Sequence, residues 1–210
     1  MAITYKPDYS FIGTLHWQRP DGRESVHGLS ATLVENAVTA VNNGWIYASV
    51  GDSYSGTEEI GLGMDHSSRR LVGLTFWFGC YYDDDENDFG YRYELRVCDQ
   101  PGRRNPFQAY TLDVSRNGYL AVYEGQMPAD ERYDESRAVL WRFTGPVLFD
   151  LSPGELEANG QVKDVALLSP KGGKVRRLVE DYFPYLNDAG GDDALFTIKV
   201  KEYGVPRPWH

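Results

Sequence analysis

The stretch from Leu71 to Cys98 constrains the fold of this chain more than any other. Two runs rich in aromatic and β-branched residues, LVGLTFWFGCYY and YRYELRVC, flank the acidic segment DDDENDFG. Such a pattern predicts a long antiparallel β-hairpin with a charged tip. The first run has large apolar residues on both faces, as a central strand does, whereas the second alternates apolar with charged residues.

The only two cysteines of the chain, Cys80 and Cys98, lie on the two arms of this predicted hairpin. Cys80 shares a face with the large apolar residues of the first arm, and Cys98 shares a face with the charged residues of the second. If the apolar faces of both arms lie on one side of the sheet, the thiols point to opposite sides and cannot form a disulfide. We therefore expect free thiols and a reducing, cytoplasmic environment.

The charge of the chain argues against two classes of partner. A net charge of −10 over 210 residues is unfavourable for binding nucleic acid, which requires clustered Lys and Arg, and for attachment to anionic membranes. No window approaches eighteen consecutive apolar residues, and the first ten residues lack the basic and apolar segments of a signal peptide. We therefore expect neither a nucleic-acid partner nor a membrane.

Alternating apolar residues elsewhere predict further strands. The predicted strands span residues 9–17, 45–51, 59–64, 109–114, 119–124, 139–143, 147–149, 162–168 and 194–203. Asn117-Gly118 is the best two-residue hairpin turn of the chain. The strand at 194–203 is expected at a sheet edge, because its outward Lys residues discourage further pairing. Mixed charges and a proline predict a surface segment over residues 125–137.

Three segments carry helical signals. Thr32 and Glu35 fit a capping box ahead of apolar residues at helical spacing, which predicts a helix near residues 32–41. Apolar residues spaced three and four apart predict a second helix over residues 174–182. A serine followed by a proline predicts only a short helical turn at residues 152–155.

These elements predict a single α+β domain over residues 1–210. Its core is expected to be a large, mostly antiparallel twisted sheet, open or partly closed, which the two longer helices cover. A β-sandwich, or a barrel with two helical excursions, is the alternative architecture.

No segment reaches the pattern of a metal, cofactor or catalytic site. Counted from Asp83, the acidic segment follows an EF-hand calcium loop up to position six, where Asp88 replaces the glycine that the sharp turn requires. Asp65, His66 and Ser67 are adjacent on a predicted turn and so cannot form a catalytic triad, which is assembled from separate segments. We therefore predict no metal, no cofactor and no catalytic residue.

The acidic segment can also act as a recognition element. Its acids would form an anionic surface with tyrosines at its base, where aromatic side chains provide contact area and charges steer a cationic partner. The predicted partner-binding residues are Asp83, Asp84, Asp85, Glu86, Asp88, Tyr82, Tyr91 and Tyr93. The partner expected from this chemistry is a protein with a basic cleft. The alternative is a solvated hairpin tip that only keeps this end soluble.

Three classes of function agree with these features. The first is a small acidic cytoplasmic inhibitor or immunity-type protein that binds and neutralises a protein partner without catalysis. The second is an enzyme or small-ligand-binding protein with an aromatic-lined pocket, because 14% of the residues are aromatic. The third is a structural or assembly subunit of a phage or secretion particle. The acidic charge and the lack of catalytic motifs favour the first.

Overall fold

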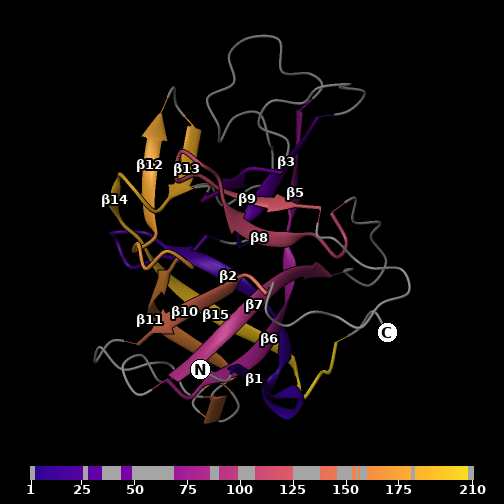
Figure 1. Ribbon diagram of the computed structural model, residues 1–210. Coiled ribbons are helices and arrows are strands. Elements are labelled where there is room, and N and C mark those ends of the chain that lie inside the picture. Colours follow the sequence, from indigo (N-terminus) through magenta and orange to yellow (C-terminus); the bar gives the residue numbers. More distant parts are fainter. Residues whose placement is uncertain are drawn as a thin grey trace.

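The predicted hairpin forms two strands of a closed six-stranded β-barrel (Figure 1). The computed structural model describes residues 3–25, 28–34, 44–48, 69–85, 90–98, 107–124, 138–145, 153–154, 156, 160–180 and 183–207. The barrel strands are β2 (Phe11–Gln18), β6 (Thr75–Asp83), β7 (Gly90–Cys98), β10 (Leu140–Thr144), β11 (Gln161–Leu168) and β15 (Leu195–Tyr203). Each is antiparallel to both neighbours, and their order around the barrel follows the chain until β15 pairs with β2 and closes the ring.

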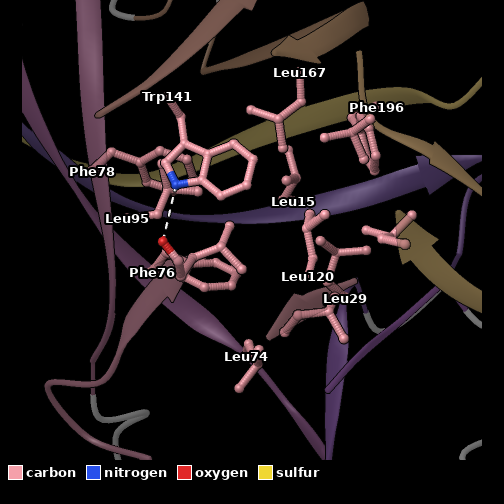
Figure 2. Packing of buried hydrophobic residues seen from close by; sticks show 14 of the residues in the cluster. Leu15, Leu29, Leu74, Phe76, Phe78, Leu95, Leu120, Trp141, Leu167 and Phe196 are labelled. Atoms are coloured by element: carbon pink, nitrogen blue, oxygen red, sulfur yellow. Dashed lines mark hydrogen bonds between the residues drawn. The ribbon is translucent and has the colours of Figure 1, made fainter. Parts of the chain in front are cut away.

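Closure is favourable because each barrel strand turns an apolar face inward. Phe78 of β6 lies directly opposite Leu95 of β7, and Phe11 of β2 stacks on Phe78 with the ring centroids 4.4 Å apart. Figure 2 shows this packing around Trp141, whose indole N–H donates a hydrogen bond to the Leu112 carbonyl at 3.0 Å. Closing the ring pairs strand edges that would otherwise be exposed.

In a closed ring of antiparallel strands, successive connections alternate between the two ends, so three of them leave the barrel at the same end. The first contains β3 (Ser30–Val34), β4 (Ile46–Tyr47) and β5 (Arg69–Gly73), the second contains β8 (Thr111–Val114) and β9 (Leu120–Tyr123), and the third contains β12 (Arg176–Glu180), β13 (Phe183–Asn187) and β14 (Asp192–Asp193). The first and third build a second sheet in the order β14-β12-β13-β4-β3-β5, while β8 pairs with β7. We call these eight strands the cap, which gathers toward the upper end of Figure 1.

One aromatic residue from each connection joins the three parts of the cap. Trp45 of the first connection stacks on Tyr119 of the second at 4.8 Å, and Tyr185 of the third meets both rings edge-on at 5.3 Å. Isolated backbone bridges also link Trp45 to Ala121 and Tyr119 to Asn187. A single buried apolar cluster contains residues of both the barrel and the cap, so the two are packed together.

The opposite end of the barrel, which we call the hairpin end, carries the β6–β7 turn. Here β1 (Ile3–Tyr5) pairs with the end of β6, and the 3-10 turn η1 (Pro7–Tyr9) follows. The Ser10 carbonyl accepts a hydrogen bond from the Val205 N–H at 2.9 Å, and the Trp77 indole N–H donates to the Val205 carbonyl at 2.9 Å. The first and last described segments therefore lie side by side at this end.

The expected α+β class is wrong, because the described residues are nearly all β and contain no helix that covers the sheet. Residues Ser30–Val34 form strand β3 where the first helix was expected to begin, and residues 35–43 lie outside the described part of the chain. Within the second expected helix, residues Arg176–Glu180 form β12, which pairs with β13 on one side and β14 on the other, and residues 181–182 lie outside the described part of the chain. Their apolar spacing is compatible with either state, and the two flanking strands satisfy the backbone hydrogen bonds of a strand.

The expected position of residues 194–203 at a sheet edge is also wrong. Strand β15 lies within the ring, with β2 and β11 on its two sides. The ammonium group of Lys199 does not prevent this pairing, because its Nζ atom lies 2.7 Å from Glu24 Oε2.

Several other expectations are confirmed. The hairpin arms pair in the expected register, and Cys80 and Cys98 are both buried and free. Asn117-Gly118 lies in the connection between β8 and β9, as expected, with Gly118 at a φ of 86°, where glycine is favoured. The expected two-residue turn is wrong, because the Gly118 N–H donates to the Ser115 carbonyl and so makes Arg116 and Asn117 the central residues of the turn. The described residues between 153 and 156 are helical, as expected. The strands expected at 59–64 and 147–149 and the surface segment at 125–137 lie outside the described residues.

Candidate functional site

Three tyrosines from three elements meet at the hairpin end of the barrel. Tyr82 of β6 lies directly opposite Tyr91 of β7, with ring centroids 5.3 Å apart and ring planes at 65°. Tyr9 of η1 meets Tyr91 edge-on at 6.4 Å. Tyr9 is 41% exposed, and Tyr82 and Tyr91 are partly exposed. We call these three residues the tyrosine cluster.

A buried serine fixes the position of Tyr9 in this cluster. The Ser10 hydroxyl donates to the Lys6 carbonyl at 3.2 Å and accepts from the Cys80 N–H at 3.0 Å, which ties the end of η1 to the middle of β6. The Lys6 N–H in turn donates to the Cys80 carbonyl at 2.8 Å. Pro7 at the first position favours the turn between these two anchors. The aromatic surface is therefore held on a rigid support.

Several carboxylates adjoin the tyrosine cluster in the chain. Asp83 is buried, and its Oδ1 atom accepts from the Asp85 N–H at 3.2 Å, so it shapes the start of the turn. Asp84 is exposed and Asp85 is partly exposed, and Asp8 of η1 adds another exposed carboxylate. Glu86 and Asp88, also predicted to bind a partner, lie outside the described residues.

Tyr93 lies apart from the other predicted tyrosines. Its ring is fully buried inside the barrel, 5.3 Å from Phe143 and 6.1 Å from Phe11. Burial raises the pKa of Tyr93 well above its ordinary value. Burial also raises the pKa of Tyr91, and the neighbouring groups Cys80, Tyr9 and Tyr82 add to that rise. Tyr91 therefore keeps its hydroxyl proton at neutral pH and can donate a hydrogen bond to a partner.

A buried ionic network covers the outer face of the hairpin. The Tyr81 hydroxyl donates to Glu94 Oε2 at 3.1 Å, and Arg96 holds Glu94 Oε1 at 2.7 Å. Arg207 donates to the Tyr81 hydroxyl at 2.8 Å, and its guanidinium lies 4.1 Å from the ring centroid of Tyr5. Glu94 occupies position twelve of the loop counted from Asp83, and because its carboxylate is engaged in this network it is not available there as a calcium ligand. The network holds the last described segment against β1 and β6.

A cleft lies on the outside of the barrel, next to the cap. This cleft has a volume of about 510 Å³ and is lined by the end of β2, the middle of β11, β12 and β14. Sequence patterns did not indicate it, because four segments far apart in the chain contribute its walls. Its signal in the sequence is limited to isolated charged residues in and near several strands.

Within the described ranges, no group of three or more His, Cys, Asp or Glu side chains could hold a metal ion. No helix in that part of the chain is both long and apolar enough to cross a membrane. Comparison with protein families, with curated proteins and with solved structures found no match to this chain. In the part of the chain that the structure describes, the tyrosine cluster and the cleft have geometries that suggest recognition.

Proposed function

We propose that this protein is an acidic cytoplasmic inhibitor or immunity-type protein, which binds and neutralises a protein partner and performs no catalysis. The observation that carries the proposal is the tyrosine cluster, which presents aromatic area on a rigid support beside exposed carboxylates. Tyrosine is enriched at the energetic centres of protein interfaces. A rigid support reduces the conformational entropy lost on binding.

Charge supports a basic partner. Asp8 adjoins Tyr9 in the chain, Asp84 and Asp85 follow Tyr82 closely, and the whole chain carries a net charge of −10. Such charges accelerate association with a positively charged cleft and exclude acidic competitors. The two free cysteines support a reducing compartment, hence the cytoplasm.

The two alternative functions differ in what they require. A ligand site inside the barrel needs an internal cavity, whereas large side chains such as Phe11, Phe78 and Phe196 are fully buried there. The ligand-binding alternative therefore requires a site on the outside of the barrel. An assembly subunit would use the same tyrosine cluster against copies of itself rather than against a basic partner. The identity of the bound protein therefore separates the assembly alternative from the proposal.

Capture from a lysate of the native host, followed by mass spectrometry, tests the proposal with matched variants. Wild-type protein is compared with Tyr9→Ala, with Asp84→Asn/Asp85→Asn, and with Val179→Ser as the control. Val179 is 56% exposed on β12, at the cap. We expect one basic protein to be retained by wild type and by the control but weakly by the other two variants.

The purified partner then permits a kinetic test. The Asp84→Asn/Asp85→Asn variant should associate more slowly than wild type at low salt, and the difference should shrink at high salt because exposed charges are screened. If the variant and wild type associate at equal rates at both salt concentrations, the hairpin end is not part of the interface. Retention of only the protein itself would favour the assembly alternative.

A further inference from the structure

The cleft beside the cap contains an arginine that is held in place and still has open hydrogen-bond donors. The guanidinium of Arg177 lies 4.4 Å from the ring centroid of Trp17, and its Nε atom donates to the Ala48 carbonyl at 3.2 Å. Its two terminal nitrogens make no hydrogen bond with any residue in the described ranges. Stacking on Trp17 and one hydrogen bond thus orient the planar guanidinium of Arg177, which lines the cleft and keeps its terminal N–H donors available there.

A carboxylate with no ion-pair partner among the described residues lines the same cleft. Asp192 of β14 lies directly opposite Arg177 in the sheet, a position where opposite charges usually pair. Arg177 contacts Trp17 and Ala48 instead, so it interacts with Asp192 only through longer-range charge attraction. Asp192 forms no close ion pair in the part of the chain that the structure describes. The next pair behaves differently, because Arg176 lies 3.5 Å from Asp193.

The other charged groups around the cleft already have partners. Arg19 lies 3.2 Å from Asp21, and Lys163 lies 3.2 Å from Glu24. Asp164, which occupies a bulge of β11 with a φ of 57°, meets the Gln18 side-chain amide at 3.0 Å through Oδ1 and at 3.1 Å through its N–H. Asp193 is held by Lys174 at 2.5 Å. One guanidinium edge and one carboxylate, those of Arg177 and Asp192, are thus left facing the cleft.

We propose that this cleft binds a small zwitterion of the α-amino acid type, with its carboxylate on Arg177 and its ammonium group at Asp192. The three acids of the lining would repel a simple anion, and its three bases would repel a simple cation. A zwitterion can instead pair its carboxylate with a base and its ammonium group with an acid. Pro20 and Leu195, which is 37% exposed, provide an apolar wall for a side chain. The volume of about 510 Å³ suits a ligand of this size.

This site is independent of the proposed partner-binding surface. The cleft involves the cap and the barrel strands next to it, whereas the tyrosine cluster lies at the hairpin end. A failure of one proposal therefore leaves the other standing.

Thermal shift and titration calorimetry on the full chain test the inference. The twenty common amino acids are screened at 10 mM, and the best apolar one is compared with its N-acetyl and its amide derivatives, each of which lacks one charge. We expect an apolar amino acid to raise the melting temperature, because ligand that binds only the native state stabilises it. Both derivatives should bind about tenfold more weakly or worse, since each leaves a charged group of the site unsatisfied.

Two variants and a control locate the binding. Asp192→Asn should weaken binding about tenfold or more without loss of stability, because this exposed side chain makes no hydrogen bond with the described residues. Arg177→Lys keeps the charge but loses the planar fork and should also weaken binding. Glu202→Gln removes an exposed carboxylate from β15 and should bind like wild type. The inference is overturned if no amino acid binds, or if Asp192→Asn and the N-acetyl derivative bind as well as their parents.

Discussion

Trp77 lies across the backbone of Gly79 on the outer face of β6. A Cβ atom built on Gly79 would lie 2.1 Å from Cη2 of the Trp77 ring, closer than any real contact. The ring is fully buried and its indole N–H holds the Val205 carbonyl, so it has little freedom to move aside. The glycine is therefore required by this side-chain contact rather than by an unusual backbone angle.

Gly79→Ala should lower the free energy of unfolding by about 1–3 kcal/mol, because a displaced tryptophan strains the surrounding packing. Gly190→Ala is the matched control, since nothing lies within 4 Å of a Cβ atom there and its φ is not in the left-handed region. Urea denaturation followed by circular dichroism measures both changes. Equal midpoints for the two variants would contradict the contact.

The thiol of Cys80 should be inert in the folded protein. Burial raises its pKa to about 12 from an ordinary value of 9.0, and this outweighs the opposing effects of Tyr93 and Lys6. A raised folded-state pKa means that the stability gained from the neutral thiol is complete below about pH 9 and is lost as the pH rises toward about 12.

The Cys98→Ala variant isolates Cys80 for this measurement. At pH 8 the native variant should not react with a thiol reagent, whereas in urea without reductant it should yield one free thiol. Its unfolding free energy should fall as the pH is raised above about 9. Rapid reaction of the native variant would contradict the burial of Cys80.

At the scale of elements, local sequence patterns predicted correctly the structures that form between segments adjacent in the chain. The β6–β7 and β8–β9 hairpins were predicted because both arms and the turn are contiguous. The segment over residues 174–182 was not, since Val175 and Val179 fit a helical face although Val179 proves to be 56% exposed on a strand. Its conformation is decided by pairing with β13 and β14, which local spacing does not report.

The same limit applies to the candidate sites. Tyr82 and Tyr91 were predicted together because they face each other across one hairpin. Tyr9 joins them only through the docking of η1 by Ser10, a contact between residues 70 positions apart. The cleft needs residues from β2, β11, β12 and β14, so no local motif could indicate it.

Glu24 joins three strands at the closing seam of the barrel. Its carboxylate follows β2 and meets Lys163 of β11 at 3.2 Å, and Lys199 and Thr197 of β15 at 2.7 and 3.0 Å. Burial raises the pKa of Glu24, but the hydrogen bonds from Lys199, Thr197 and Lys163 outweigh it and lower the pKa to about 2. Stability from this group is therefore present above about pH 4.5 and is lost as the pH falls toward 2.

Glu24→Gln should lower the free energy of unfolding by about 1–2 kcal/mol at pH 7, a modest value because the lysines are partly exposed to water. The difference from wild type should shrink as the pH falls from 4.5 toward 2, where the wild-type carboxyl becomes half protonated, and should vanish below that pH. Glu202→Gln, also next to the seam but exposed, should show neither effect. Urea titrations at a series of pH values measure this, and a difference that does not change with pH would contradict the assignment.

At the scale of the whole molecule, the step that could not be predicted is closure of the ring. Strands β2 and β15 pair over most of their length, although they lie at opposite ends of the described chain. Each strand has a recognisable apolar face, but periodicity says nothing about which distant strand is its neighbour. An open sheet and a closed barrel therefore share the same local signals.

The continuity of the buried cluster predicts that barrel and cap unfold together. Tryptophan fluorescence and far-ultraviolet circular dichroism should give superimposable urea transitions. Tyr185→Ala removes a contact with Trp45 and Tyr119 and should lower the free energy of unfolding by about 3–5 kcal/mol. Both probes should report the same lowered urea midpoint. Two separated transitions, or a shift of one probe alone, would show that the cap is a separate unit and that residues 1–210 are more than one domain.

The β2–β15 pairing also means that the barrel cannot close until almost the whole described chain has been synthesised. At the usual ~5–20 residues per second, β2 leaves the ribosome roughly 10–40 s before its partner strand exists. During that interval the edge of β2 that will pair with β15 is unpaired, and an unpaired edge of an apolar strand promotes aggregation of nascent chains. Chaperones would have to protect the incomplete barrel from aggregation in the cell. The yield of folded protein should therefore depend on chaperone concentration more strongly than the stability of the finished protein suggests.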